Sequence, residues 1–119
     1  MKRTLLPVLL LLATLFAGCS QEQYGAGLDP AAPKVQVRDI FLQPALIGKQ
    51  VTLEGTVVSQ CQSNGCWFFL KDDTGQIYID LSTNQFSLPA VPGKQVVASG
   101  QVARSQQNVL LIASGVEVK

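Results

Sequence analysis

Residues 48–57 read Gly-Lys-Gln-Val-Thr-Leu-Glu-Gly-Thr-Val, and residues 93–102 repeat this pattern as Gly-Lys-Gln-Val-Val-Ala-Ser-Gly-Gln-Val. The first copy alternates apolar and polar side chains from Val51 to Val57, which is typical of a half-buried β-strand. Each copy carries a glycine in mid-strand, Gly55 or Gly100, and such a glycine permits a bulge or sharp bend. The repeat therefore predicts two similar strands that curl round a small closed barrel.

Three further segments complete an all-β pattern. Residues 66–71, 76–81 and 109–118 are rich in β-forming side chains and are bounded by turn residues. Asp72-Asp73-Thr74-Gly75 predicts a tight hairpin turn, in which the two acids form the turn and are not a catalytic pair. Residues 82–92 contain too many prolines for a long helix, so we expect a short turn or half-helix over one barrel end.

Five strands, two of them bent at glycine, with the longest connection between the third and fourth, resemble an OB-fold, a five-stranded Greek-key barrel. Residues 35–119 also resemble small exported bacterial OB-fold families described as nucleic-acid-binding-like or of unknown function. This resemblance implies the fold but no ligand, because OB barrels bind unrelated molecules. The residues that carry it are Asp39-Ile40-Phe41, Gly48-Lys49, Gly55, Cys61, Gly65-Cys66-Trp67, Asp73, Gly75, Leu88-Pro89, Gly93-Lys94, Gly100 and Gly115-Val116-Glu117.

The amino terminus is typical of a secreted lipoprotein. Lys2 and Arg3 precede an apolar stretch from Leu5 to Phe16, which ends at Ala17-Gly18-Cys19. This order is that of a secretory signal peptide, and the small residues before the cysteine resemble a bacterial lipobox. The apolar stretch is shorter than the roughly 20 residues of a transmembrane helix. We expect residues 1–18 to be removed and Cys19 to carry acyl chains such as palmitate, which anchor the protein in the membrane.

The residues after Cys19 predict the location of the domain. Ser20 stands where an aspartate commonly signals retention in the inner membrane, so we expect an outer-membrane lipoprotein that faces the periplasm. Residues 19–34 are polar and small, with glycine and proline that break any period, and they predict a flexible tether. Residues 35–119 then form one domain of ordinary size.

The charge balance bears on the partner. Without Lys2 and Arg3 the chain has seven basic and eight acidic residues, a formal net charge of −1. A near-neutral domain gains little from counterion release on a polyphosphate. We therefore expect the membrane as one partner, through the lipid anchor, and an envelope protein or small ligand as another. The charge balance argues against nucleic acid as a partner.

Cys61-Gln-Ser-Asn-Gly-Cys66 places two thiols at the ends of a short loop. In the oxidising periplasm such a pair usually forms a disulfide, worth about 2 kcal/mol for a small loop. Two alternatives stay open: a Cu(I) site, because soft thiolates select that ion, and a thiol-redox site. Zinc is disfavoured because structural sites take four ligands and the chain has no histidine. No helix N-terminus is evident that would lower a thiol pKa, and the sequence predicts no cofactor.

Aromatic residues follow the second cysteine. Alternation along the strand places Trp67 and Phe69 on one face, and Tyr78 and Asp80 of the next strand oppose the core set of Ile77, Ile79 and Leu81. The second and third strands of OB barrels commonly form the ligand face. An alternative is that one or two of the rings only cap the core. The predicted ligand-binding face consists of Trp67, Phe69, Tyr78 and Asp80, with Lys71 and Lys94 as a cationic rim.

Three function classes follow. The leading hypothesis is a periplasm-facing, lipid-anchored binding module for a small ligand, a peptide or an envelope partner protein. The alternative is a metal or thiol-redox accessory protein that uses Cys61 and Cys66. An enzyme is not expected, because no histidine is available as a general base and no Gly-x-Ser-x-Gly motif occurs. The resemblance to periplasmic haem-delivering OB chaperones stops at the fold, because their haem attachment uses a histidine.

Overall fold

The computed structural model describes residues 21–119, so the predicted signal peptide and the lipidated Cys19 lie outside the described residues. Each of the five strands expected from the sequence is present, together with one short helix. None of the helices in residues 21–119 is long and apolar enough to cross a membrane. The elements are β1 (Glu22–Gly25), α1 (Val37–Leu42), η2 (Pro44–Leu46), β2 (Gln50–Gln60), β3 (Trp67–Asp72), β4 (Gly75–Asp80), η3 (Ser82–Asn84), β5 (Gln95–Ser105) and β6 (Asn108–Val118).

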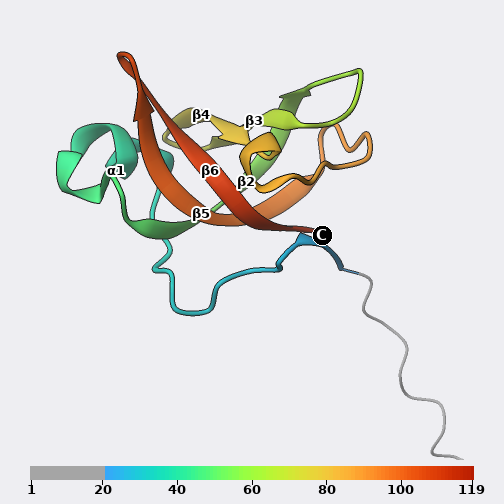
Figure 1. Ribbon diagram of the computed structural model, residues 1–119, viewed down its shortest axis with the longest axis horizontal. Coiled ribbons are helices and arrows are strands. Elements are labelled where there is room, and N and C mark those ends of the chain that lie inside the picture. Colours follow the sequence, from blue (N-terminus) through green and yellow to red (C-terminus); the bar gives the residue numbers. More distant parts are fainter. Residues whose placement is uncertain (1–20) are drawn as a thin grey trace, which may run out of the picture.

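Strands β2 to β6 close into a barrel (Figure 1). Antiparallel ladders join β2 to β3 and to β5, β3 to β4, and β5 to β6. A short parallel pairing of Ile79 with Leu111 and of Asp80 with Ile112 connects β4 to β6 and completes the ring. This is the all-β, five-stranded OB barrel that the sequence predicts.

The two glycines of the repeated decamer allow strands to cross closely. A Cβ at Gly55 would lie 2.4 Å from the carbonyl oxygen of Lys71, and a Cβ at Gly100 would lie 2.3 Å from that of Ile112. The register between β5 and β6 shifts between Ser99 and Gly100, as a bulge requires. The bulge of β2 falls between Val57 and Ser59, a few residues after Gly55. Both strands bend as predicted, with one bulge displaced from its glycine.

The core follows the alternation of the strands. On β3, Phe68 and Leu70 are fully buried, and on β4 Ile77 and Ile79 are buried on either side of the half-exposed Tyr78. The outer side chains of β3 and β4 therefore remain available to form a site. The connection after β4 contains only the short η3, which confirms the predicted short turn between residues 82 and 92.

Helix α1 covers one end of the barrel and was not predicted. Val37 and Ile40 enter the core one turn apart. Asp39 accepts a hydrogen bond from the backbone N–H of Gln36 and completes a capping box. The β3–β4 turn supplies a second cap, because the Asp72 carboxylate accepts from the backbone N–H of Val37 at 2.9 Å. Six residues are too few to show a helical period in a sequence.

Residues 22–34 lie on the barrel, whereas the sequence predicts a flexible tether for residues 19–34. Strand β1 pairs with β6 from Glu22 opposite Val118 to Gly25 opposite Gly115. Lys34 forms an ion pair with Glu54 at 2.7 Å. The carbonyl group of Gly27 lies so close to Gly115 that a Cβ at residue 115 would collide with the Gly27 carbonyl oxygen. The small residues that suggested flexibility instead allow close packing against the edge of β6.

Candidate functional site

Three aromatic rings form a cluster on the outer face of β3 and β4. Cross-strand pairing sets Phe69 opposite Tyr78 and Trp67 opposite Asp80. The rings of Trp67 and Tyr78 are stacked at 5.7 Å, and Phe69 meets both rings edge-on, with centroids 6.0 Å from Trp67 and 5.5 Å from Tyr78. Such geometries are favourable beyond simple burial. All three side chains are half-exposed, so the structure brings the predicted aromatic residues together on the surface.

An apolar cavity of about 510 Å³ adjoins this cluster. Phe69 and Tyr78 form one wall, and Phe41 of α1, which is 49% exposed, contributes another. The turn between β5 and β6 closes the third side with Ser105, Gln107 and Asn108. No charged side chain lines the cavity among the described residues. Sequence reasoning missed Phe41, because its contribution depends on a helix that the pattern does not reveal.

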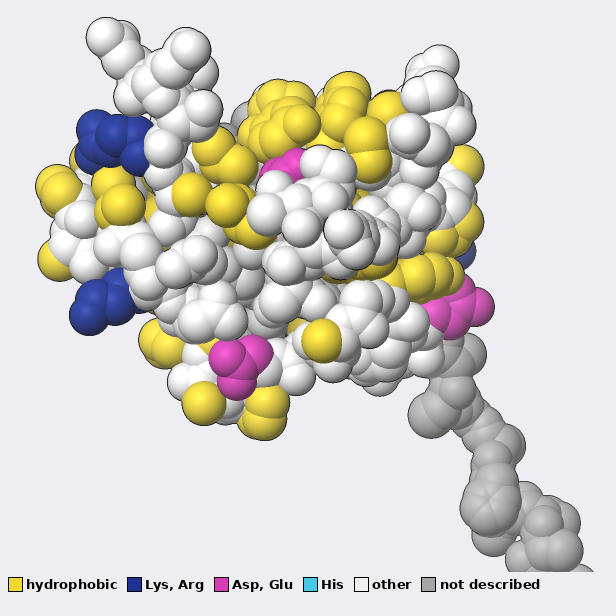
Figure 2. Space-filling view, viewed as in Figure 1, with side chains coloured by type: hydrophobic (Ala, Val, Ile, Leu, Met, Phe, Trp, Pro, Cys, Tyr) yellow, Lys and Arg dark blue, Asp and Glu magenta, His cyan; other side chains and the backbone are white. Residues whose placement is uncertain are grey.

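Figure 2 shows apolar side chains gathered along this edge of the barrel. They lie between two projections, the β2–β3 loop and the β5–β6 turn, which can be located in Figure 1. In OB-folds the loops at these two positions border the ligand-binding face. The aromatic cluster thus occupies the place where the fold commonly binds its ligands.

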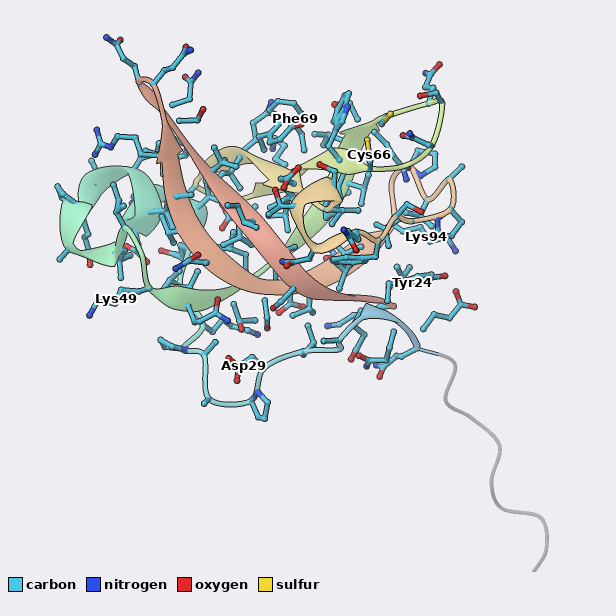
Figure 3. All side chains as sticks on the ribbon, in the orientation of Figure 1. Tyr24, Asp29, Lys49, Cys66, Phe69 and Lys94 are labelled. Carbon is cyan, nitrogen blue, oxygen red and sulfur yellow. The ribbon has the colours of Figure 1, made fainter. Side chains whose placement is uncertain are left out.

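The charged residues predicted for this face lie differently. Asp80 is on the outer face but only 9% exposed, and its carboxylate accepts hydrogen bonds from Ser82 Oγ and the Thr83 N–H. Burial alone would raise the pKa of Asp80, but these hydrogen bonds lower it. Lys71 is exposed and lines a different cavity, and Figure 3 shows Lys94 well away from Phe69. Lys71 follows Phe69 on the same outer face of β3, but neither lysine lines the cavity beside the aromatic cluster, and the cationic rim stays a prediction.

The two cysteines lie together in the β2–β3 loop, next to the aromatic cluster (Figure 3). Their sulfur atoms are 3.8 Å apart, and both are free thiols. The loop is held by main-chain hydrogen bonds from Cys61 to Trp67 and from Leu81 to Cys66. The structure confirms that the loop juxtaposes the pair, but the predicted disulfide is not formed. A bond would require the sulfurs to approach by about 1.8 Å, to the usual length of about 2.05 Å.

The two thiols differ in acidity. The pKa of Cys61 is lowered to about 6, because the backbone N–H of Asn64, the hydroxyl of Ser63 and the backbone N–H groups of Cys66 and Ser63 are directed at its sulfur. The pKa of Cys66 is raised by burial, by the hydrogen bond that it makes to Cys61, and by the negative charge of the Cys61 thiolate. A helix N-terminus is a common source of such an effect. The loop backbone supplies it instead.

The thiols and the aromatic cluster are electrostatically coupled. Burial raises the pKa of Tyr78, and the charges of Asp80, Cys66 and Cys61 raise it further. Within residues 21–119 no group of three or more histidine, cysteine, aspartate or glutamate side chains is placed to hold a metal ion. The Cu(I) alternative would therefore rest on the two thiols alone and stays a prediction.

Comparisons with known proteins support the fold. No protein-family model and no curated protein match the sequence. The hypothetical protein ygiW from E. coli is similar in structure, with a TM-score of 0.60 and 19% sequence identity over 80% of this chain and 99% of that one. The asparaginyl-tRNA synthetase from Pyrococcus horikoshii is similar over 71% of this chain but 22% of its own, with a TM-score of 0.55 and 18% identity. At such identities the likeness establishes an OB-fold and no activity.

Proposed function

We propose that this chain is a lipid-anchored binding module of the bacterial envelope, which holds an uncharged apolar ligand on the outer face of β3 and β4. The ligand class is an apolar peptide segment, such as one presented by a partner protein, or a small neutral molecule. The observation that carries the proposal is the cavity of about 510 Å³ between the aromatic cluster and Phe41, lined without a charged side chain. Ligand sites are typically concave and apolar in this way.

The composition of the face argues against a nucleic acid ligand. Proteins that bind single strands combine stacking rings with a positively charged groove. Here the rings are present, but Lys71 lines another cavity with the acidic residues Glu54, Asp72 and Asp73. A polyphosphate would therefore gain stacking without charge neutralisation.

The orientation of the face suits a ligand that arrives from the periplasm. In Figure 3 the labelled Tyr24, on β1, lies on the opposite side of the barrel from Phe69. If Cys19 carries the lipid, the few residues before β1 span at most roughly 10 Å, at about 3.5 Å per residue. Such an anchor would hold the β1 side towards the membrane and leave the aromatic cluster accessible.

The single tryptophan of the chain provides a direct test, because Trp67 belongs to the cluster. The purified protein is titrated with N-phenyl-1-naphthylamine, a neutral apolar probe, and with short apolar peptides, while Trp67 emission is recorded. We expect Phe69→Ala to weaken binding about ten-fold or more, as truncation of an aromatic anchor does. The matched control is Leu42→Ala on α1, which is 70% exposed and outside the cavity. It should leave binding unchanged.

Two outcomes would contradict the proposal. Equal binding by wild type, Phe69→Ala and Leu42→Ala would remove the case for this face. Displacement of the probe by a single-stranded oligonucleotide would show that the ligand class is wrong. The anchor is tested separately, by mass spectrometry of the mature amino terminus, where an unmodified residue 19 would contradict lipidation.

A further inference from the structure

We propose that Cys61 and Cys66 form a thiol–disulfide exchange site, in which Cys61 is the attacking thiol, Cys66 the resolving thiol, and the substrate a disulfide in a polypeptide. This activity does not depend on the proposed apolar ligand, because it uses the β2–β3 loop and not the cavity at Phe41. Three features of the loop carry the inference: the sulfur-to-sulfur distance, the donors around Cys61, and the cavity beside that half-exposed residue.

The distance and the donors define the roles of the two thiols. At 3.8 Å the sulfurs are close enough to bond after a small side-chain movement. As a neutral thiol, Cys61 donates to Asn64 Oδ1 at 3.2 Å. Once ionised, its sulfur is held instead by the loop N–H groups and by the Ser63 hydroxyl, 3.4 Å away, which lower its pKa. This environment stabilises a thiolate at Cys61, which is the nucleophilic form. Cys66 stays protonated while Cys61 is charged, since burial, the hydrogen bond to the Cys61 sulfur and the Cys61 charge all raise the pKa of Cys66.

The exchange balances in two steps. The Cys61 thiolate attacks one sulfur of the substrate disulfide, and the other sulfur leaves as a thiolate that takes a proton from water. Loss of the charge on Cys61 in this mixed disulfide lets Cys66 release its proton to solvent. The Cys66 thiolate then attacks Cys61 Sγ and expels the second substrate thiolate. Overall, two protein thiols are oxidised to a disulfide, and one substrate disulfide is reduced to two thiols.

The surroundings of Cys61 indicate a polypeptide substrate. A cavity of about 680 Å³ opens beside the loop, lined by residues 58–60 of β2, residues 61–65 of the loop, and residues 88–90 with Pro92. Amide side chains of Gln62 and Asn64 border it, and none of its lining side chains is charged. Neutral amides suit a peptide backbone better than the charged ends of glutathione disulfide. The titratable groups facing the cysteine pair from β4 are Asp80 and Tyr78.

The first experiment uses the reduced, purified full chain and two single variants, mixed with a cystine-bridged neutral peptide or with glutathione disulfide. We expect wild type to form the Cys61–Cys66 disulfide and Cys66→Ser to accumulate a mixed disulfide at Cys61, identified by peptide mass mapping. Cys61→Ser should react at least about ten-fold more slowly. The peptide should react faster than glutathione disulfide, and the reverse order would overturn the assignment of a polypeptide substrate.

The second experiment measures the pH dependence of alkylation of Cys61 by iodoacetamide in Cys66→Ser. We expect a midpoint near pH 6, following the lowered pKa of Cys61, and an upward shift of the midpoint in the additional presence of Ser63→Ala, which removes the hydroxyl that stabilises the thiolate. The midpoint is a better readout than the rate at pH 7, because thiolate nucleophilicity falls as pKa falls. Equal reaction rates of both single variants, or a midpoint at the ordinary pH of about 8.5, would overturn the proposal.

A control separates this site from the proposed apolar ligand site. Phe69→Ala should keep the midpoint and the mixed disulfide of the parent protein, even if it no longer binds an apolar probe. Unfolding curves of each variant in urea confirm that the barrel is intact, so a loss of reactivity reports on the thiols and not on folding.

Discussion

Strand β3 is bounded by two polar turns that both stabilise a negative charge. At one end, backbone N–H groups of Ser63, Asn64 and Cys66 lower the pKa of the Cys61 thiol. At the other, burial alone would raise the pKa of Asp72, but hydrogen bonds from Thr74 and from backbone N–H groups lower it. The two groups thus share one physical device, in which oriented amides hold an anion.

The difference between the two turns lies in what the anion connects. Asp72 Oδ2 accepts from Val37 of α1, and Oδ1 accepts from Thr74 and Gly75 within the turn. Its charge therefore joins the hairpin to the helix that caps the barrel. The donors to Cys61 all belong to its own loop, and its sulfur borders an open cavity. A lowered pKa indicates a reactive site only where the group is accessible and no other element depends on it.

The largest difference in the free energy of unfolding is expected between alanine variants of two glycines, one in each turn. Gly65 has a φ of +63°, and a Cβ there would lie 2.1 Å from the carbonyl oxygen of Leu88. Gly75 has an ordinary φ, and its Cβ would meet nothing closer than a Val37 methyl at 3.5 Å. We expect Gly65→Ala to lower the free energy of unfolding by about 3 kcal/mol, and Gly75→Ala to change it by less than about 0.5 kcal/mol.

Urea denaturation followed by Trp67 fluorescence provides the measurement for both glycine variants. A Gly65→Ala protein as stable as wild type would show that the cysteine loop moves freely against residue 88. The rigid donor arrangement around Cys61 would then lose its structural basis.

The same two turns show what could be predicted from the sequence. Asp72-Asp73-Thr74-Gly75 identifies its hairpin because a tight turn is a local structure, encoded by adjacent residues. The alternation of residues 66–71 and 76–81 likewise assigns Phe68 to the core and Trp67, Phe69 and Tyr78 to the outer face. These parts of the fold and the site need only the period of a strand.

The features that the sequence did not reveal depend on contacts between distant segments. Phe41 joins the aromatic cavity only because Asp72, 35 residues away from Val37, caps α1. Strand β1 forms because the edge of β6 is free beside it. The N–H groups around Cys61 point at its sulfur through the conformation of the loop, which the spacing of the cysteines does not specify.

An intermediate loss of stability is expected when alanine replaces Asp72, one of the paired acids of the hairpin. Asp72→Ala removes a carboxylate that accepts three backbone hydrogen bonds, so we expect a loss of about 2 kcal/mol in the free energy of unfolding. Asp73 is exposed and accepts no hydrogen bond among the described residues, which makes Asp73→Ala the matched control, with a change below about 0.5 kcal/mol.

The pH dependence of the Asp72 effect has a definite sign. The folded pKa of this carboxyl is lowered, so its stabilisation is present above the unfolded value of about 3.9 and is lost as the pH falls through the folded value. The stability gap between wild type and Asp72→Ala should therefore narrow below about pH 4. A gap that stays constant to acid pH would show that the side chain acts through packing and not through its charge.

The smallest effect on stability is expected from Cys61, and its pH window, between about 6 and about 8.5, distinguishes it from the structural carboxylate of Asp72. The pKa of Cys61 is lowered to about 6 in the folded protein, against about 8.5 for a free thiol. Its stabilisation is thus fully present above about pH 8.5 and lost as the pH falls through about 6. In the presence of reductant, wild type should gain stability relative to Cys61→Ser between these two values, and the difference should be flat outside them. A stability difference between wild type and Cys61→Ser that stays constant over this pH window would mean that the loop amides do not stabilise a thiolate. Cys61 would then be no more reactive than an ordinary surface thiol.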